Sequence, residues 1–273
     1  MQLTSVLIGK SYDDLNALFT IAFGSHIHNG YWYSPEDHSP LEVALQRMND
    51  LIIEKLAAHR DWSVLDVGCG GGAIMRQLAT RVGCQTLGIS NSHVQIDAAN
   101  AQARAVGIDQ LAKFQFADAN SLPFPDAHFD GALTIESLCH MGNRPRVLRE
   151  LARVLRPGGR IVVVDFAQSS APLSQAEKDF LDDNELDFLL FDEIGDLFRG
   201  AGFEVLESVD LSWTTVMSQD AMLESVRQRR AELLAHYTDD FIDAFEANWL
   251  QLTDVFEKHV SYLLLVVQKP IDG

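Results

Sequence analysis

The sequence predicts an α/β protein in which a parallel sheet is covered by helices on both faces. Between residues 60 and 170, short apolar segments alternate with stretches in which apolar residues recur every three or four positions. This alternation is typical of parallel strands joined by right-handed helical crossovers. One of the segments, Ile161–Val164, is uniformly apolar, and such a strand fits a sheet that is buried on both sides.

The predicted elements follow in a regular order. The first 60 residues read as helical, and Ser39-Pro40-Leu41-Glu42 has the form of a capping box with proline at the first helical position. Strands are then expected at 63–67, 85–89, 113–117, 131–135 and 160–166. Helices are expected between them at 72–82, 92–106 and 144–155, and the last should end at the turn 156–159.

The pattern changes after residue 170. A second capping box, Ser174–Glu177, opens a helical stretch at 175–199, and a strand at 203–213, a helical stretch at 219–258 and a strand at 262–268 follow. We expect a helical arm and lid over 1–60 and one sheet domain over 61–273. Insertions at about 172–199 and 219–258 would cap the ligand edge of the sheet or serve as ordinary core helices.

Composition and charge limit the class of protein. The 273 residues carry a net charge of −18, which disfavours nucleic acid and anionic membranes as partners. The apolar run Leu263–Val267 is too short to cross a membrane, and the N-terminus lacks the charged start of a signal peptide. Three cysteines without a Cys-x-x-Cys pair fit a reducing compartment, so we expect a cytoplasmic protein. We also expect no metal site, because no set of His, Cys or carboxylate residues stands at ligand spacing. Apolar residues within 3–23 favour a homo-oligomer paired through its N-terminal helices.

A glycine-rich turn marks the first strand as a ligand site. A buried strand there runs into glycines and then a helix, in the segment Val64-Leu65-Asp66-Val67-Gly68-Cys69-Gly70-Gly71-Gly72. Glycines at this position allow a tight turn and let a ligand approach the main chain closely. The spacing also satisfies the dinucleotide pattern G-x-G-x-x-A, so a nicotinamide oxidoreductase is one reading.

Acidic residues favour a cationic ligand over a pyrophosphate. A nicotinamide site needs an acid about 20 residues after the glycines to bind the ribose, whereas the second strand here is followed by Ser90-Asn91-Ser92. The acids instead lie at Asp66, Asp118 and Glu136, along the edge where open α/β sheets bind ligands. A row of carboxylates suits a sulfonium cofactor.

These residues resemble the class I S-adenosylmethionine-dependent methyltransferases, which have a Rossmann-like fold with a seven-stranded, mostly parallel sheet. The resemblance is clear over 60–165, and the family's first motif is matched by VLDVGCGGG. It implies that Asp66 and the turn Gly68-Cys69-Gly70 face the methionine part of the cofactor. It also implies that Asp118, with Ala119 beside it, accepts from the adenine amino group.

The second strand and the N-terminus point to one subgroup. Most class I enzymes place an acid after the second strand, but Ser90 and Asn91 stand here, and Gln95 completes a Ser-x-x-Gln variant. That variant resembles sterol and tocopherol methyltransferases, cyclopropane synthases and natural-product sugar O-methyltransferases, which implies a ribose contact for Gln95. Tyr12 and Trp32 belong to a stretch similar to the "YD…H-x-G-Y-W" opening of this subgroup, which folds over the cofactor.

The catalytic candidates follow the fourth and fifth strands. His140 is the best base, because an imidazole with a pKa near 6.5 can be neutral at working pH. Asp165 ends the fifth strand and could orient His140 or take the proton itself. Both positions resemble the "ES-L-x-H-M" and "DF" segments of the sugar O-methyltransferases.

The acceptor is expected to be a small, largely apolar specialised metabolite. Aromatic residues that could wall its pocket are Phe180, Phe188, Phe191, Phe198, Trp213 and Phe245. Methylation of oxygen in a glycoside or polyketide and methylation of carbon in a terpenoid both stay open. A cyclase on a methyltransferase scaffold is a further alternative.

Overall fold

A seven-stranded sheet forms the centre of the computed structural model, which describes residues 5–24, 26, 28–169 and 171–271, with the backbone alone for 5–13. The strand order is β3-β2-β1-β4-β5-β7-β6. Strands β1 to β5 are parallel, and β7 runs antiparallel to both β5 and β6. The bounds are β1 Ser63–Val67, β2 Gln85–Ser90, β3 Ala112–Phe116, β4 Phe129–Ile135, β5 Leu155–Gln168, β6 Glu204–Asp210 and β7 Val260–Gln268.

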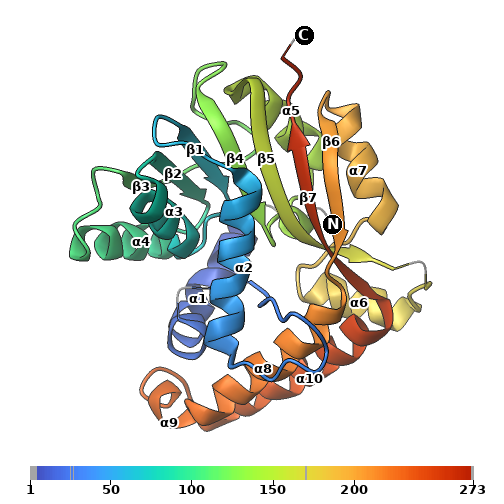
Figure 1. The fold of residues 1–273 in the computed structure, drawn as a ribbon. Coiled ribbons are helices and arrows are strands. Elements are labelled where there is room, and N and C mark those ends of the chain that lie inside the picture. The colour runs from blue at the N-terminus through green and yellow to red at the C-terminus, as the bar shows by residue number, and fades with distance from the viewer. Residues whose placement is uncertain (1–4, 25, 27, 170, 272–273) are drawn as a thin grey trace.

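Helices cover both faces of the sheet, as predicted (Figure 1). One face packs against α2 (Leu41–Leu56), α3 (Ala73–Val82) and α4 (His93–Ala105). The other packs against α5 (Arg144–Val154) and α7 (Phe191–Gly200). Successive residues of β5 go to opposite faces, with Val162 and Val164 in one core and Ile161 and Val163 in the other. This alternation explains why that strand is uniformly apolar.

The turn expected at 156–159 is part of β5. That strand already begins at Leu155, directly after α5, and pairs with β4 from there. A register shift between Phe129 and Gly131 of β4 accommodates the glycine-containing segment, in which Gly158 has a φ of +79°. The Pro-Gly-Gly sequence therefore makes an irregular strand start instead of a turn outside the sheet.

The capping box expected at Ser39 is wrong. Helix α2 begins at Leu41 with Pro40 as its N-cap and has no side-chain cap. The Ser39 hydroxyl instead donates to Asp37 Oδ1 at 2.6 Å, and Arg47 pairs with the other oxygen of Asp37. The hydroxyl thus makes a charge-assisted hydrogen bond to a carboxylate, and it does not accept one from a backbone amide of the helix.

The helical stretch expected at 175–199 divides in two. The capping box at Ser174 and Glu177 is confirmed and opens α6 (Gln175–Asp183). Residues 184–190 then leave the helix, and α7 buries Ile194 and Phe198 against the sheet. Only α6, the first half of the expected insertion, lies outside the two layers of helices that cover the sheet.

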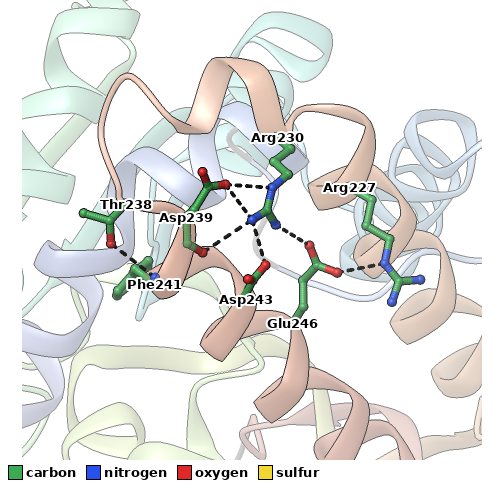
Figure 2. A network of polar contacts seen from close by, with 7 residues as sticks. All are labelled: Arg227, Arg230, Thr238, Asp239, Phe241, Asp243 and Glu246. Carbon is green, nitrogen blue, oxygen red and sulfur yellow. Dashed lines mark hydrogen bonds and ion pairs between the residues drawn. The ribbon is translucent and has the colours of Figure 1, made fainter.

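The C-terminal helices form a hairpin beneath the carboxyl ends of the parallel strands (Figure 1). Helix α8 (Trp213–Gln228) starts six residues before the sequence predicted, and α9 (Arg230–Leu233) separates it from α10 (Asp239–His259). Arg230 bonds Asp239, Asp243 and Glu246, and Arg227 also bonds Glu246 (Figure 2). These ion pairs tie the turn of the hairpin to the first turns of α10.

Helix α1 (Ser5–Phe23) packs against this hairpin. Leu18, Phe19, Ala22 and Phe23 are buried in a third apolar cluster with residues of α8 and α10. The apolar side chains behind the expected pairing of two copies are thus used within the chain from residue 18 onward. In the part of the chain that the structure describes, no helix is both long and apolar enough to cross a membrane.

Candidate active site

The glycine turn after β1 has room for glycine alone. Gly68, Gly70 and Gly72 all have a φ between +49° and +89°, which L side chains rarely adopt. A Cβ atom on Gly68 would lie 2.5 Å from Ser137 Cβ. The amides of Gly68 and Cys69 both donate to the Ile89 carbonyl, which holds the turn against β2. The backbone at the turn is therefore tightly fixed.

Asp66 is a buried carboxylate that lacks a full set of partners. It is 2% exposed at the carboxyl end of β1, and its Oδ1 has no hydrogen-bond partner among the described residues. Burial raises the pKa of Asp66 to about 7. A cationic group bound beside it would satisfy this oxygen and favour the ionised form.

The Ser-x-x-Gln segment folds into a buried polar cluster at the end of β2. Ser92 caps α4 by accepting from the Gln95 amide at 3.0 Å. The Ser90 hydroxyl donates to Gln95 Oε1 at 2.9 Å. Gln95 is only 4% exposed, so it faces the sheet edge rather than solvent. Asn91 lies between the two serines and is half-buried.

Asp118 lies at an open position after β3. It is exposed, and its Oδ1 accepts from the backbone and side-chain amides of Asn120 at 2.9 Å. Ala119 beside it is half-buried. Two residues earlier, the exposed ring of Phe116 stacks on His93, with centroids 4.1 Å apart and planes 7° apart. His93 is itself exposed, so the two rings form a flat aromatic surface that the sequence did not indicate.

The N-terminal segment packs against α2 and α8. Trp32 is 2% exposed, and its indole N–H donates to the Ser39 carbonyl. The Trp213 indole donates to the Trp32 carbonyl. Trp32 is thus an anchor of the arm, and its contact with the cofactor stays a prediction. The Tyr12 side chain lies outside the described residues.

Glu136 joins the arm to the sheet edge. It follows β4 with a φ of +46°, and its Oε1 accepts from the Asn29 amide and the Tyr262 hydroxyl, both at 2.6 Å. Burial raises the pKa of Glu136 to about 8, and the charge of Asp165 adds to the effect. Glu136 was expected on the cofactor side, and it lines the cavity described below.

Asp165 binds the backbone of the turn that carries His140. Its Oδ2 accepts from the amides of Ser137 and Leu138, and its Oδ1 accepts from the Phe166 amide. Burial raises the pKa of Asp165 to about 6, while these bonds oppose the shift. Its oxygens therefore hold the 3-10 turn η1 (Leu138–His140) in place, and its expected part in catalysis stays a prediction.

His140 is oriented by the segment 184–190. Its Nδ1 lies 2.9 Å from the carbonyl oxygen of Glu185. A carbonyl only accepts, so Nδ1 carries the proton and Nε2 is the basic nitrogen of the neutral ring. Burial lowers the pKa of His140, which favours that neutral form.

Arg144 fixes the same segment to the turn that carries His140. It donates to the Leu138 carbonyl at 2.8 Å and pairs with the Asp187 carboxylate at 2.8 Å. The Asp187 amide in turn donates to the Cys139 carbonyl. Arg144 and Glu185 were not expected from the sequence. Arg144 donates to a backbone carbonyl and Glu185 offers its own, and such contacts leave no pattern in the sequence.

A cavity of about 240 Å³ opens beside His140 and Glu136. Its wall is mostly apolar and comes from the arm, the 184–190 segment, α8 and α10. Of the six aromatic residues expected in this wall, Phe245 alone lines the cavity as described. The aromatic side chains found there are Phe19, Phe23, Phe166, Phe245, Trp249 and Phe256. Phe198 is instead fully buried under the sheet.

The site fits S-adenosylmethionine. Asp66 offers a buried carboxylate oxygen without a partner, and a Cβ on Gly72 would lie 2.3 Å from the Phe114 ring, so the turn is shaped around bare backbone. The described residues include no group of three or more His, Cys, Asp or Glu that could hold a metal ion.

Comparison with known proteins decides the family. The methyltransferase domain family matches residues 65–163. The O-methyltransferase resE of Aspergillus sclerotiorum is 38% identical over 214 residues, which are 77% of this chain and 81% of that protein. This chain belongs to the class I S-adenosylmethionine-dependent methyltransferases. It is an enzyme that transfers methyl groups, and its cofactor is S-adenosylmethionine.

Two further methyltransferase-fold relatives cover nearly the whole chain. The 27-O-demethylrifamycin SV methyltransferase of Amycolatopsis mediterranei is 32% identical over 267 residues, 96% of this chain and 97% of its own. The crystal structure of the [4+2]-cyclase SpnF aligns with a TM-score of 0.87 at 29% identity, over 98% of each chain. The methyltransferase fold predicted from the sequence is confirmed, including its mostly parallel sheet.

Proposed function

We propose that this methyltransferase transfers a methyl group to a hydroxyl oxygen of a small, largely apolar specialised metabolite. The observation that supports this proposal is His140, a neutral imidazole of fixed tautomer at the wall of an apolar cavity. A hydroxyl acceptor must lose its proton as the new bond to carbon forms, and a positioned base at that point speeds such a transfer. Methylation of a terpenoid carbon would first form a carbocation and lose its proton afterwards, so it would depend on stabilisation of that cation before it needed a base.

The cofactor is proposed to lie along the carboxyl ends of β1, β2 and β3. When bound, S-adenosylmethionine supplies a methyl group that is electrophilic because its sulfur is positively charged. Asp66 would bind its ammonium group, the backbone of Gly68, Cys69 and Gly70 would lie against the methionine part, and Gln95 with Ser90 and Asn91 would face the ribose. Asp118 and Ala119 would bind the adenine beside the ring of Phe116.

His140 is proposed to act as the general base. Its Nε2 would take the hydroxyl proton while Nδ1 keeps its bond to the Glu185 carbonyl, so the charge that forms on the ring is stabilised by a carbonyl dipole. Asp165 would act as a positioning residue, since it holds the turn on which His140 lies.

The apolar wall supports an apolar acceptor. A cavity lined by phenylalanine and tryptophan rings binds ligands mainly by removing their apolar surface from water. The relative from Amycolatopsis mediterranei acts on 27-O-demethylrifamycin SV by its name, and a specialised metabolite of that general kind fits the cavity.

The cellular location is proposed to be the cytoplasm. The three cysteines of this chain are free and buried, which fits a reducing compartment.

Mass spectrometry tests the proposed function. The purified chain is incubated with S-adenosylmethionine labelled at its methyl group and with a panel of phenols, polyketide alcohols and terpene alcohols. A product that has gained one labelled methyl on oxygen supports the proposal. Labelled products that are resistant to the cleavage of methyl ethers would show methylation at carbon and contradict it, as would a lack of label in every product.

A cyclase is the second candidate, favoured by the likeness to SpnF over almost the whole chain. In that case the cofactor would order the site without losing its methyl group. Product mass separates the two functions, because cyclisation by isomerisation leaves the mass unchanged and methylation adds the mass of one CH2 group. Turnover of a polyene substrate without formation of S-adenosylhomocysteine would support the cyclase.

A further inference from the structure

Two amide side chains face each other in the wall of the cavity. Asn29 comes from the N-terminal arm and Gln219 from α8, and they are 1% and 3% exposed. A single hydrogen bond joins them, from Gln219 Nε2 to Asn29 Oδ1 at 3.2 Å. Both residues line the cavity that also contains His140 and Glu136.

Each amide keeps one polar atom without a partner. Asn29 Nδ2 and Gln219 Oε1 are buried and have no hydrogen-bond partner within the described ranges. Buried polar atoms are nearly always paired, so an orphaned donor beside an orphaned acceptor marks a place where another molecule completes the bonds. The cavity wall is mostly apolar, and the other two amide side chains described in it, Asn184 and Asn248, are hydrogen-bonded to each other.

The backbone at both residues is held in place by hydrogen bonds that do not use the orphaned side-chain atoms. The Asn29 amide donates to Glu136 Oε1 at 2.6 Å, and the neighbouring Gly30 amide donates to the Ser218 hydroxyl at 3.0 Å. The Trp249 indole donates to the Gln219 carbonyl at 3.1 Å. The pair is therefore pre-organised, and a ligand would not have to order it on binding.

We propose that Asn29 and Gln219 form a hydroxyl-binding subsite, which orients a hydroxyl-bearing acceptor in the cavity. A hydroxyl group accepts one hydrogen bond and donates another from a single atom, so it can satisfy Asn29 Nδ2 and Gln219 Oε1 together. Reversing both amides would exchange the donor and the acceptor and would leave the same requirement. The proposal rests on the proposed function, because it takes the cavity to be the acceptor site.

The subsite recognises acceptors by a polar group in an otherwise apolar site. A hydrocarbon of the same shape would fill the cavity but leave Asn29 Nδ2 and Gln219 Oε1 without partners, and a site built in this way discriminates against ligands that lack the polar group. The subsite lies beside Glu136, because the Asn29 backbone amide donates to that carboxylate. A bound acceptor would therefore lie next to the edge of the sheet.

A pair of matched ring compounds tests the subsite. Binding of para-fluorophenol and para-fluorotoluene is followed by fluorine NMR on the full chain with saturating S-adenosylhomocysteine. The two probes differ in one group, hydroxyl or methyl, and a single ring fits a cavity of this size, since benzene binds in a smaller one. The ratio of the two dissociation constants reports the preference for the hydroxyl.

Variants on two separate elements keep the test independent of folding. Gln219→Met and Asn29→Leu each remove one orphaned atom, and Asn29→Leu leaves the backbone bond to Glu136 intact. We expect each to reduce the preference for the phenol by about threefold to tenfold. Gln219→Glu keeps an acceptor oxygen and should retain more of the preference than Gln219→Met does. Gln228→Met, at the exposed end of the same helix, should leave the preference unchanged.

Three results would overturn the subsite. They are an unchanged preference in folded Gln219→Met and Asn29→Leu, an equal loss in Gln228→Met, and a failure of the wild-type chain to bind either probe. The labelled-methyl measurement is separate. A chain that transfers methyl to a hydroxyl but shows one of these results keeps its proposed function and loses the subsite.

Discussion

The Nδ1 atom of His140 lies 2.9 Å from the carbonyl oxygen of Glu185, 45 residues further along the chain. Glu185 follows α6 with a φ of +59°, a conformation that costs a residue with a side chain about 1–2 kcal/mol. Strain of this kind persists where the surrounding structure holds it, and Arg144 holds the same segment through Asp187. The orientation of the base therefore depends on the segment between α6 and α7.

Replacement of His140 should affect turnover and not cofactor binding. We expect His140→Ala to lower kcat by about 100-fold to 10,000-fold, the usual contribution of a general base. The dissociation constant for S-adenosylmethionine, measured by calorimetry, should stay near the wild-type value, because His140 lines the cavity proposed for the acceptor. Turnover close to wild type would remove His140 from the mechanism.

The pH dependence of kcat/KM for the acceptor should reflect the buried state of His140, when it is measured with saturating S-adenosylmethionine so that the ionisation of Asp66 does not contribute. The pKa of His140 is lowered from 6.5, mainly by burial, and the ring acts as a base only while neutral, above that pKa. Activity should therefore persist below pH 6.5 and fall only at lower pH. A rate profile with an acid limb centred at or above pH 6.5 would contradict this prediction.

Cofactor affinity should rise with pH because of Asp66. Its pKa is raised to about 7, so the carboxylate that attracts a cation is fully formed only above that pH. We expect the affinity for S-adenosylmethionine to increase about tenfold from pH 6 to pH 8 in calorimetric titrations. Asp66→Asn should bind weakly and with a flat pH profile, whereas Asp118→Asn, at an exposed position, should weaken binding but keep the rise. The same rise in Asp66→Asn would refute the assignment.

Gly68 should tolerate no side chain. Gly68→Ala would combine a φ of +89° with a Cβ 2.5 Å from Ser137 Cβ. Gly107→Ala is a matched control, because Gly107 has a φ of +73° and nothing within 4 Å of its Cβ position. We expect the control to lose about 1–2 kcal/mol of unfolding free energy in urea. Gly68→Ala should lose more and should also lose cofactor binding, and equal losses would show that the contact with Ser137 is unimportant.

Arg230 should hold the turn of the α8–α10 hairpin. It bonds Asp239, Asp243 and Glu246, so Arg230→Ala removes three partners at once (Figure 2). Hydrogen exchange should become faster in α9 and at the start of α10, with cofactor affinity unchanged. Arg199→Ala breaks one exposed pair with Asp196 on α7 and should leave exchange in the hairpin as it was. Unaltered exchange in Arg230→Ala would mean that packing alone orders the turn.

Local patterns in the sequence predicted the sheet and its ligand edge. The bounds of β1 were predicted correctly, and α3 and α4 begin within one residue of the expected positions. These features depend on neighbours in the chain, since the period of apolar residues and the turn after a strand are decided within a few residues. The glycine turn belongs to the same class, because its positive φ angles and bare backbone require glycine itself.

The apolar cavity depended on tertiary structure. Its aromatic wall joins Phe19 of α1 to Phe166 of β5 and Trp249 of α10, residues that the sequence separates by up to 230 positions. Apolar burial has no preferred direction, so composition shows that these rings will be buried but not against which partner. For the same reason the partners of His140 and Asp165 became known only from the fold, since backbone groups accept or donate regardless of residue type.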